Sequence, residues 1–472
     1  MKNCLFVMAG AAFAVGCLSS LVPSARAGMR GFFSQTLGET VVVTNYADAK
    51  ADFAFFDRKL GRDNHLLIEE TAADADHVRF AFRADPPLGA YFRYFVPGDC
   101  IRPRVVLNGT VRDGVTPGRL NWIWRKWRDG DVLELDFSAK GEAKRGESGR
   151  AAWMRGRYGV MVHWLFPSAG DIDRWTDAFD LDGFMVDFDR TGADWLVFTA
   201  GQCNGAYCSP NAAFDGFCGP GHTSRRDLLA EIAAAVRKRG KRFIVYSACD
   251  FVRDGCADHA MQKGLGWDNA SEDRRTFQSR WPRVLREWAV RLGRNCDGWW
   301  LDGVGVQYPN GVDFAVWEEA CRAGNPDAAL AFNPASNDFS SYGPSDYAAG
   351  ETSSLKWIVA DPNGLEPVDA VRHYLFPVDG YWGGFWAWPT GEWAGVSHLG
   401  KTRPEMFDAA KLRTMSARGE FPDPIYTAAE LRRYLAFIRE HGGAATINVG
   451  IDAKGRINPK SIELIRKGTG RQ

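Results

Sequence analysis

Residues 224–248, SRRDLLAEIAAAVRKRGKRFIVYSA, place the pattern of a helix directly before the pattern of a strand. Ser224 and Asp227 suit an N-terminal cap and first turn, and Gly240 suits the C-terminal end of a helix. The apolar run 242–248 predicts a strand. A helix that leads directly into a strand indicates an α/β fold.

The same alternation of strands and helices continues along most of the chain. A doubly wound open sheet is one interpretation, but no G-x-G-x-x-G follows the first strand. Eight strands alternating with helices over roughly 300 residues are instead typical of a (β/α)8 barrel. We therefore expect residues 151–472 to form such a barrel. The predicted strands are 158–164, 193–200, 242–248, 297–303, 328–334, 347–352, 383–388 and 445–450.

Residues 28–140 follow a different pattern, with short apolar runs separated by turn pairs such as Asn-Gly, Pro-Gly and Asp-Gly. The alternation is clearest at Val78, Phe80 and Phe82. This pattern predicts an all-β sandwich in front of the barrel. Residues 141–150 are rich in charge and lack an apolar period, so we interpret them as a linker.

Residues 1–27 carry the features of a secretory signal peptide. A lysine near the start is followed by an apolar stretch and by the small-residue end Ala25-Arg26-Ala27, which predicts cleavage after Ala27 and a secreted or periplasmic protein. A lipoprotein site at Gly16-Cys17 ranks second, because Ala14 fits that pattern poorly. No later stretch reaches about 18 uninterrupted apolar residues, so we expect no membrane span in the mature chain.

Charge and aromatic content limit the classes of partner. The 58 basic residues balance 58 acidic residues, so nothing points to nucleic acid or an anionic membrane surface. The 18 Trp, 13 Tyr and 30 Phe supply large cores, and aromatic rings also stack on sugars. The sequence does not reveal whether the protein is a monomer or an oligomer.

In an exported protein, cysteines are expected as disulfides or core thiols. Cys203, Cys208, Cys218 and His222 imitate a zinc site, but their spacing is irregular, so no metal is predicted. We expect at least one disulfide in the loops after the second and third strands, among Cys203, Cys208, Cys218, Cys249 and Cys256.

Asp302 is the first candidate catalytic residue. It follows Trp299-Trp300-Leu301 at the end of a predicted strand, and barrel enzymes carry their catalytic groups at the C-terminal ends of strands. A plain turn is the competing interpretation, because Asp-Gly is a common turn pair.

Several spaced segments between about residues 150 and 468 together resemble the α-L-fucosidases of glycoside hydrolase family 29. WWLDG resembles the strand that carries the nucleophilic aspartate of that family. The other similar segments are YGVMVHWLFPS with His163 and Trp164, SRRDLLAEIAAAVRKRGKRFIVYS with Arg226, Asp227, Tyr246 and Ser247, SDYAAGE (345–351), and HGGAATINVGIDAKGRINPKSIELI (441–465).

The resemblance implies a retaining glycosidase that acts on a glycan without a cofactor. Such enzymes need two carboxyl groups about 5–5.5 Å apart, one as nucleophile and one as acid and then base. Asp302 is the expected nucleophile and Glu351 the expected acid/base, with Glu392 second and Glu366 third.

The expected sugar site departs from the family pattern. Where the family has Lys-His-His-Asp-Gly-Phe, this chain reads Gly-Gln-Cys-Asn-Gly-Ala at 201–206, so neutral amides replace the histidines that hold sugar hydroxyls. The resemblance implies an α-L-fucosyl substrate, and this departure favours a related α-L-sugar as the alternative. The candidate substrate-binding residues are His163, Trp164, Gln202, Asn204, Tyr246, Trp300 and Trp386.

A different class stays open, namely a carbohydrate-binding protein whose barrel has lost catalysis, because the histidine pair is absent. Retention of Asp302 and Glu351 argues against it.

The sandwich precedes the barrel here, whereas in the family it usually follows. No H-E-x-x-H, P-loop or G-x-S-x-G motif occurs, so metalloprotease, nucleotide-binding and serine-hydrolase interpretations lack support.

Overall fold

The computed structural model of the chain divides into two compact units, Met1–Ala143 and Lys144–Gln472. The predicted signal peptide lies outside the described residues. Within the part that is described, no helix is both long enough and apolar enough to cross a bilayer. The described residues are 33–37, 40–44, 67–73, 76–83, 88–96, 100–112, 114, 115, 117, 120–141, 148–165, 172–202, 205–251, 259–267, 274–304, 308, 311–333, 342–352, 370–379, 418 and 420–470.

The first unit consists of two β-sheets. Most neighbouring strands are antiparallel, but β2 and β5 run parallel. One sheet has the order β1 (Phe33–Leu37), β2 (Thr40–Thr44), β5 (Leu88–Phe95) and β8 (Leu120–Trp127). The other has the order β3 (Leu67–Ala73), β4 (His77–Arg83), β9 (Val132–Asp136), β6 (Arg104–Leu107) and β7 (Thr110–Val111).

Both sheets contribute to one hydrophobic core in this unit. Phe82 of β4 stacks on Trp127 of β8 with ring centroids 3.9 Å apart, and Phe92 of β5 meets both rings at an angle. Leu133 and Leu135 alternate inward along β9, as a strand with one buried face requires. The two sheets therefore pack face to face.

The second unit is built on a seven-stranded parallel sheet with the order β14-β13-β12-β11-β10-β16-β15. Six predicted strands are confirmed here. The strands are β10 (Tyr158–Val162), β11 (Trp195–Thr199), β12 (Arg242–Ala248), β13 (Gly298–Asp302), β14 (Ala329–Asn333), β15 (His373–Pro377) and β16 (Ala444–Val449).

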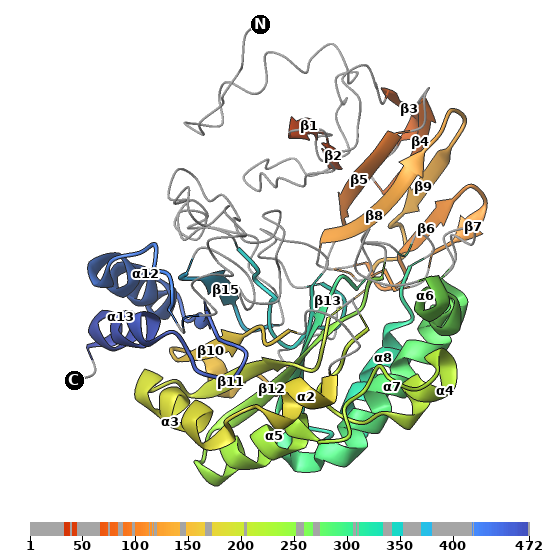
Figure 1. Cartoon of the computed structure of the whole chain (residues 1–472). Coiled ribbons are helices and arrows are strands. Elements are labelled where there is room, and N and C mark those ends of the chain that lie inside the picture. Colours follow the sequence, from red (N-terminus) through yellow and green to blue (C-terminus); the bar gives the residue numbers. More distant parts are fainter. Residues whose placement is uncertain are drawn as a thin grey trace, which may run out of the picture. The chain divides into compact units, whose positions relative to one another are not determined.

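Helices cover the outer side of this sheet, as α3, α5, α7 and α8 show in Figure 1. The cap of α5 is Asp227, whose carboxylate accepts from the Ala230 amide at 3.1 Å, rather than Ser224. The described helices are η1 (Ala152–Met154), α2 (Ile172–Asp177), α3 (Leu181–Thr191), α4 (Ala212–Cys218), α5 (Leu228–Lys238), α6 (His259–Leu265), α7 (Arg275–Leu292), η3 (Gly293–Asn295), α8 (Phe314–Arg322), α12 (Ala428–Glu440) and α13 (Pro459–Thr469).

An irregular segment, residues 346–352, bridges the two edge strands of the sheet. On one side the Asp346 amide donates to the Leu330 carbonyl of β14 at 2.7 Å. On the other side the Thr352 amide donates to the Leu375 carbonyl of β15 at 2.8 Å. We call residues 346–352 the seam, because they link the two edges of the curled sheet.

The structure thus shows a curled sheet of seven parallel strands with a seam, which confirms the α/β class but not the predicted (β/α)8 barrel. The seam occupies the predicted strand 347–352 but makes isolated bridges, so no eighth parallel strand occurs among the described residues of this unit. The predicted strand 383–388 lies outside them. Strand β15 was not predicted, because His373–Pro377 is short and holds a histidine and a proline.

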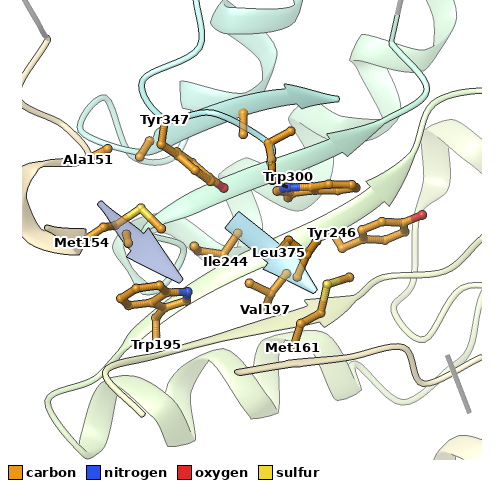
Figure 2. Packing of buried hydrophobic residues seen from close by; sticks show 14 of the residues in the cluster. Ala151, Met154, Met161, Trp195, Val197, Ile244, Tyr246, Trp300, Tyr347 and Leu375 are labelled. Atoms are coloured by element: carbon orange, nitrogen blue, oxygen red, sulfur yellow. Dashed lines mark hydrogen bonds between the residues drawn. The ribbon is translucent and has the colours of Figure 1, made fainter. Parts of the chain in front are cut away.

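The interior of the curled sheet holds one hydrophobic core, shown in Figure 2. Large rings fit beside small residues on the neighbouring strands, Trp300 beside Ala331 and Trp195 beside Gly159, which is how large and small residues fill such an interior. The core draws on all seven strands and on the seam: Met161, Trp195, Val197, Ile244, Tyr246, Ala248, Trp300, Ala329, Ala331, Tyr347, Ala349, Leu375 and Ala444 are among its members.

Candidate active site

Asp302 is the last residue of β13, at the carboxyl end of the parallel sheet. Its carbonyl oxygen accepts from the Cys249 amide at 2.7 Å, and the next residue, Gly303, donates to the Asn333 carbonyl at 3.0 Å. The backbone on both sides of the Asp302 side chain is therefore fixed by the two neighbouring strands. Such an edge is where parallel α/β sheets carry their sites.

Gly303 is required by geometry. Its φ is +76°, which L side chains rarely adopt, and a Cβ placed there would lie 2.7 Å from Cγ of Asp250. A side chain at this position has no room. The Asp-Gly pair therefore does form a turn, and the same turn leaves the Asp302 carboxylate at the strand end.

Two side chains donate to the Asp302 carboxylate. The Tyr246 hydroxyl donates to Oδ2 at 2.5 Å, and Nδ2 of Asn333 donates to Oδ1 at 2.8 Å. Nε2 of Gln202 in turn donates to the Tyr246 hydroxyl oxygen at 2.7 Å. Each carboxylate oxygen thus has its own donor, and hydrogen bonds to a charged carboxylate stabilise it.

Glu351 lies in the seam, and it shares a donor with Asp302. Nδ2 of Asn333 is 2.7 Å from Oε2 of Glu351 as well as 2.8 Å from Oδ1 of Asp302. The two carboxylate oxygens are therefore no more than about 5.5 Å apart, the sum of these distances. Both carboxyl groups are partly exposed, so a ligand can reach them.

His163 supports the site as a neutral ring. It is buried, and burial lowers its pKa to about 4. Nδ1 carries a proton and donates to Oδ1 of Asn448 at 2.9 Å. The imidazole meets the Tyr246 ring edge-on, with centroids 4.9 Å apart, so it helps to fix the tyrosine that contacts Asp302.

Two of the three predicted tryptophans are described, and they lie in different layers. Trp300 stacks on Tyr246 with centroids 5.3 Å apart, and the two rings lie side by side in Figure 2. Trp164 is 0% exposed, packs against Phe179, and donates to the Ala453 carbonyl. Successive residues of an extended chain point to opposite sides, so His163 and Trp164 separate.

The structure thus brings together Asp302, Glu351, Gln202, Tyr246, His163 and Trp300, while Trp164 lies apart in the outer layer. The predicted residues Asn204 and Trp386, and the second and third acid/base candidates Glu392 and Glu366, lie outside the described residues. Asn333 was missed. Its position at the end of the predicted strand 328–334 was the available signal, because that is also the position of Asp302 in its own strand.

The cysteines of the neighbouring loops are thiols where they are described. No disulfide joins Cys208, Cys218 and Cys249 to one another. Burial raises the pKa of the Cys208 thiol and of the Cys249 thiol. Cys203 and Cys256 lie outside the described residues. No group of three or more His, Cys, Asp and Glu side chains suited to a metal ion occurs within the described ranges.

Comparisons with known proteins give structural neighbours. No protein-family model matches the sequence, and no curated protein matches it. Similar solved structures include the endo-fucoidan hydrolase MfFcnA4 from glycoside hydrolase family 107, at 16% identity and a TM-score of 0.47 over 68% of this chain and 53% of that chain. This chain therefore spans about half the length of that protein.

Two further neighbours are fucosidase structures. The alpha-L-fucosidase isoenzyme 1 from Paenibacillus thiaminolyticus has 16% identity and a TM-score of 0.45, over 69% of this chain and 75% of that chain. SpGH29 has 14% identity and a TM-score of 0.42, over 69% of each chain. The structural neighbours of this protein thus include α-L-fucosidases of family 29 and fucoidan hydrolases of family 107, at low identity.

Proposed function

We propose that the protein is an exported, retaining glycoside hydrolase in which Asp302 is the nucleophile and Glu351 the acid/base. The observation that carries this proposal is the spacing of the two carboxyl groups, whose oxygens lie within about 5.5 Å because both accept from Nδ2 of Asn333. Retaining glycosidases use carboxyl groups about 5–5.5 Å apart, whereas inverting ones need about 6.5–9.5 Å.

The roles follow from the surroundings of each carboxyl group. Asp302 lies on a strand and accepts from Tyr246 and Asn333, which suits an ionised nucleophile of fixed position. In the first step it attacks the anomeric carbon, and Glu351 gives its proton to the departing oxygen. In the second step Glu351 takes a proton from water, and that water cleaves the ester between the sugar and Asp302.

The substrate is an α-L-fucosyl or a related α-L-sugar at the end of a glycan. The resemblance of the strand and seam segments to family 29 supports the α-L-sugar. Gln202 is the reason to expect a related sugar as well as fucose, because it stands where the family has a histidine. Its Nε2 donates to Tyr246 and so orients a residue that contacts the nucleophile. A site with altered hydrogen-bonding partners discriminates among sugars by their hydroxyl groups.

The test is turnover of a panel of aryl α-L-glycosides and larger glycans. We expect weak action on the simple aryl α-L-fucoside and better turnover of a related sugar, such as the α-L-galactoside, or of a larger glycan. The first product should keep the α-configuration, which NMR of the anomeric proton reports. A first product of inverted configuration contradicts double displacement, and silence across the panel with intact sugar binding favours a carbohydrate-binding protein.

The nucleophile is tested by Asp302→Gly. This variant should lose turnover, and added azide should restore part of it as a glycosyl azide of inverted anomeric configuration, because azide fills the space of the missing carboxylate. Asp327→Gly is the matched control, since the Asp327 side chain is 74% exposed and on the surface. Unchanged turnover in Asp302→Gly removes Asp302 from the mechanism.

A further inference from the structure

Asn333 is the last residue of β14, and its side chain is almost fully buried, with 1% exposure. Its Nδ2 faces both carboxylates, while its Oδ1 is buried and has no hydrogen-bond partner among the described residues. An unpaired buried acceptor costs free energy. The reverse orientation of the amide is worse, because Oδ1 would then face two carboxylate oxygens. The carboxylates therefore determine how this amide points.

We propose that Asn333 is a positioning residue that sets the separation of Asp302 and Glu351 and couples their ionisation. This inference rests on the proposed glycosidase function. One nitrogen atom with two N–H groups holds both acceptors, so neither carboxyl group moves without changing a hydrogen bond to the other. The backbone adds to this, because the Asn333 carbonyl accepts from the Gly303 amide at 3.0 Å, next to Asp302.

The amide is suited to this task because it is neutral. A lysine or arginine between the carboxyl groups would favour ionisation of both, and the acid/base could not then hold a proton for the leaving group. Asn333 supplies directed donors without placing a net charge between the two carboxyl groups.

Asn333 also has a part in the second step of the reaction. When Asp302 becomes an ester it loses its charge, and its Oδ1 becomes a weaker acceptor for Nδ2. The hydrogen bond from Nδ2 to Oε2 of Glu351 then stabilises the carboxylate that activates water. The same donor group thus serves both steps, with its stronger hydrogen bond on whichever carboxyl group is charged.

The test compares Asn333→Ala and the isosteric Asn333→Asp with the control Asn325→Ala. Asn325 is also buried, precedes the same strand, and donates to the Cys296 carbonyl at 2.8 Å, away from the carboxylates. On a substrate that the wild type cleaves, we expect kcat to fall on the order of 100-fold in both Asn333 variants, as for a misplaced reacting group, while KM changes far less.

The pH profile separates positioning from structural damage. Loss of the donor removes stabilisation of both carboxylates, so both limbs of kcat/KM against pH should move to higher pH in Asn333→Ala. Asn325→Ala should leave both limbs where they are. If Asn333→Ala lowers kcat with both limbs unmoved, or if it behaves like Asn325→Ala, the positioning role is wrong.

A measurement without turnover distinguishes this inference from the proposed function. Melting temperatures are compared for Asn333→Ala, Glu351→Gln and the double variant. Because the two side chains share a hydrogen bond, the shifts should not add. Non-additive shifts in a protein that cleaves no glycoside support the coupling and contradict the glycosidase. Additive shifts in an active glycosidase overturn the coupling and leave the function standing.

Discussion

The hydroxyl group of Tyr246 donates a hydrogen bond of 2.5 Å to Oδ2 of Asp302. The two residues belong to neighbouring strands, since Tyr246 lies in β12 and Asp302 ends β13. The tyrosine ring is itself held by Trp300 on one face and by the edge of His163. The donor is thus fixed before any substrate arrives, which is the condition under which a hydrogen bond contributes most to catalysis.

Tyr246→Phe should therefore reduce kcat/KM by about 100-fold, the usual effect of removing one fixed donor from an active site. The phenyl ring keeps the stacking on Trp300, so the fold should change little. Tyr158→Phe is the matched control, because the buried Tyr158 hydroxyl donates to the Thr191 carbonyl at 2.9 Å on another part of the sheet. Steady-state kinetics and thermal unfolding of both variants check this, and equal kinetic losses contradict it.

Removal of the Glu351 carboxyl group should affect substrates unequally. Glu351→Gln should slow the cleavage of poor leaving groups by about 100- to 10,000-fold, because protonation of the departing oxygen is lost. Activated aryl glycosides need no such proton and should lose far less in the first step. Glu319→Gln serves as the control, because Glu319 of α8 is exposed and forms a surface ion pair with Arg286 of α7. Similar losses on both kinds of substrate point to Glu392 or to structural damage.

Gly303→Ala should reduce both stability and activity. The new methyl group meets Asp250 at 2.7 Å, and the backbone keeps its φ of +76°. Gly240→Ala has a similar φ of +67° but nothing within 4 Å of the new Cβ, so it measures the backbone strain alone. That strain is about 1–3 kcal/mol. Chemical denaturation should give a larger loss for Gly303→Ala, and only this variant should lower kcat by displacing Asp302.

Asp379 should make the stability of the fold depend on pH. Burial raises the pKa of its carboxyl group to about 6, against donors from Gly450, Ser461 and Asn458. A native pKa above the unfolded one favours the protonated native state, so this stability is complete below about pH 4 and is lost as the pH rises through 6.

Denaturation of wild type and Asp379→Asn between pH 4 and 7 tests this effect. The wild type should lose stability relative to the variant as the pH rises, by on the order of 3 kcal/mol at most. The difference between the two proteins is needed, because burial lowers the pKa of His163 and of His373 to about 4 and these groups act in the opposite direction. A difference that is constant with pH contradicts the assignment.

The sequence predicted the strands that are continuous apolar runs and missed those that are not. The predicted strand 242–248 matches β12 at both ends, because Phe243, Ile244, Val245 and Tyr246 form an unbroken apolar run between Arg242 and Ser247. His373–Pro377 has equally buried side chains, but five residues with a histidine and a proline carry no clear period. Burial there depends on the neighbouring strand β16, which the local sequence does not reveal.

The candidate site was partly predictable for a similar reason. The candidate roles of Asp302 and Glu351 are predicted from their positions at strand ends and from the resemblance of their segments. Both signals are contained in the local sequence. The role of Asn333 depends on contacts among three segments that meet only in the folded chain, namely β13, β14 and the seam. The resemblance of its segment predicts Trp164 beside the sugar, but adjacent side chains on extended backbone diverge.

The seam sets the distance between the two carboxyl groups and thereby the stereochemistry of the proposed reaction. One carboxyl group is carried by a regular strand, and the other by seven residues that lack a strand's continuous ladder. A change in seam length would move Glu351 while β13 stays in place. Separation of the two groups to about 6.5–9.5 Å would admit a water molecule between carboxylate and sugar, and the anomeric outcome would change from retention to inversion.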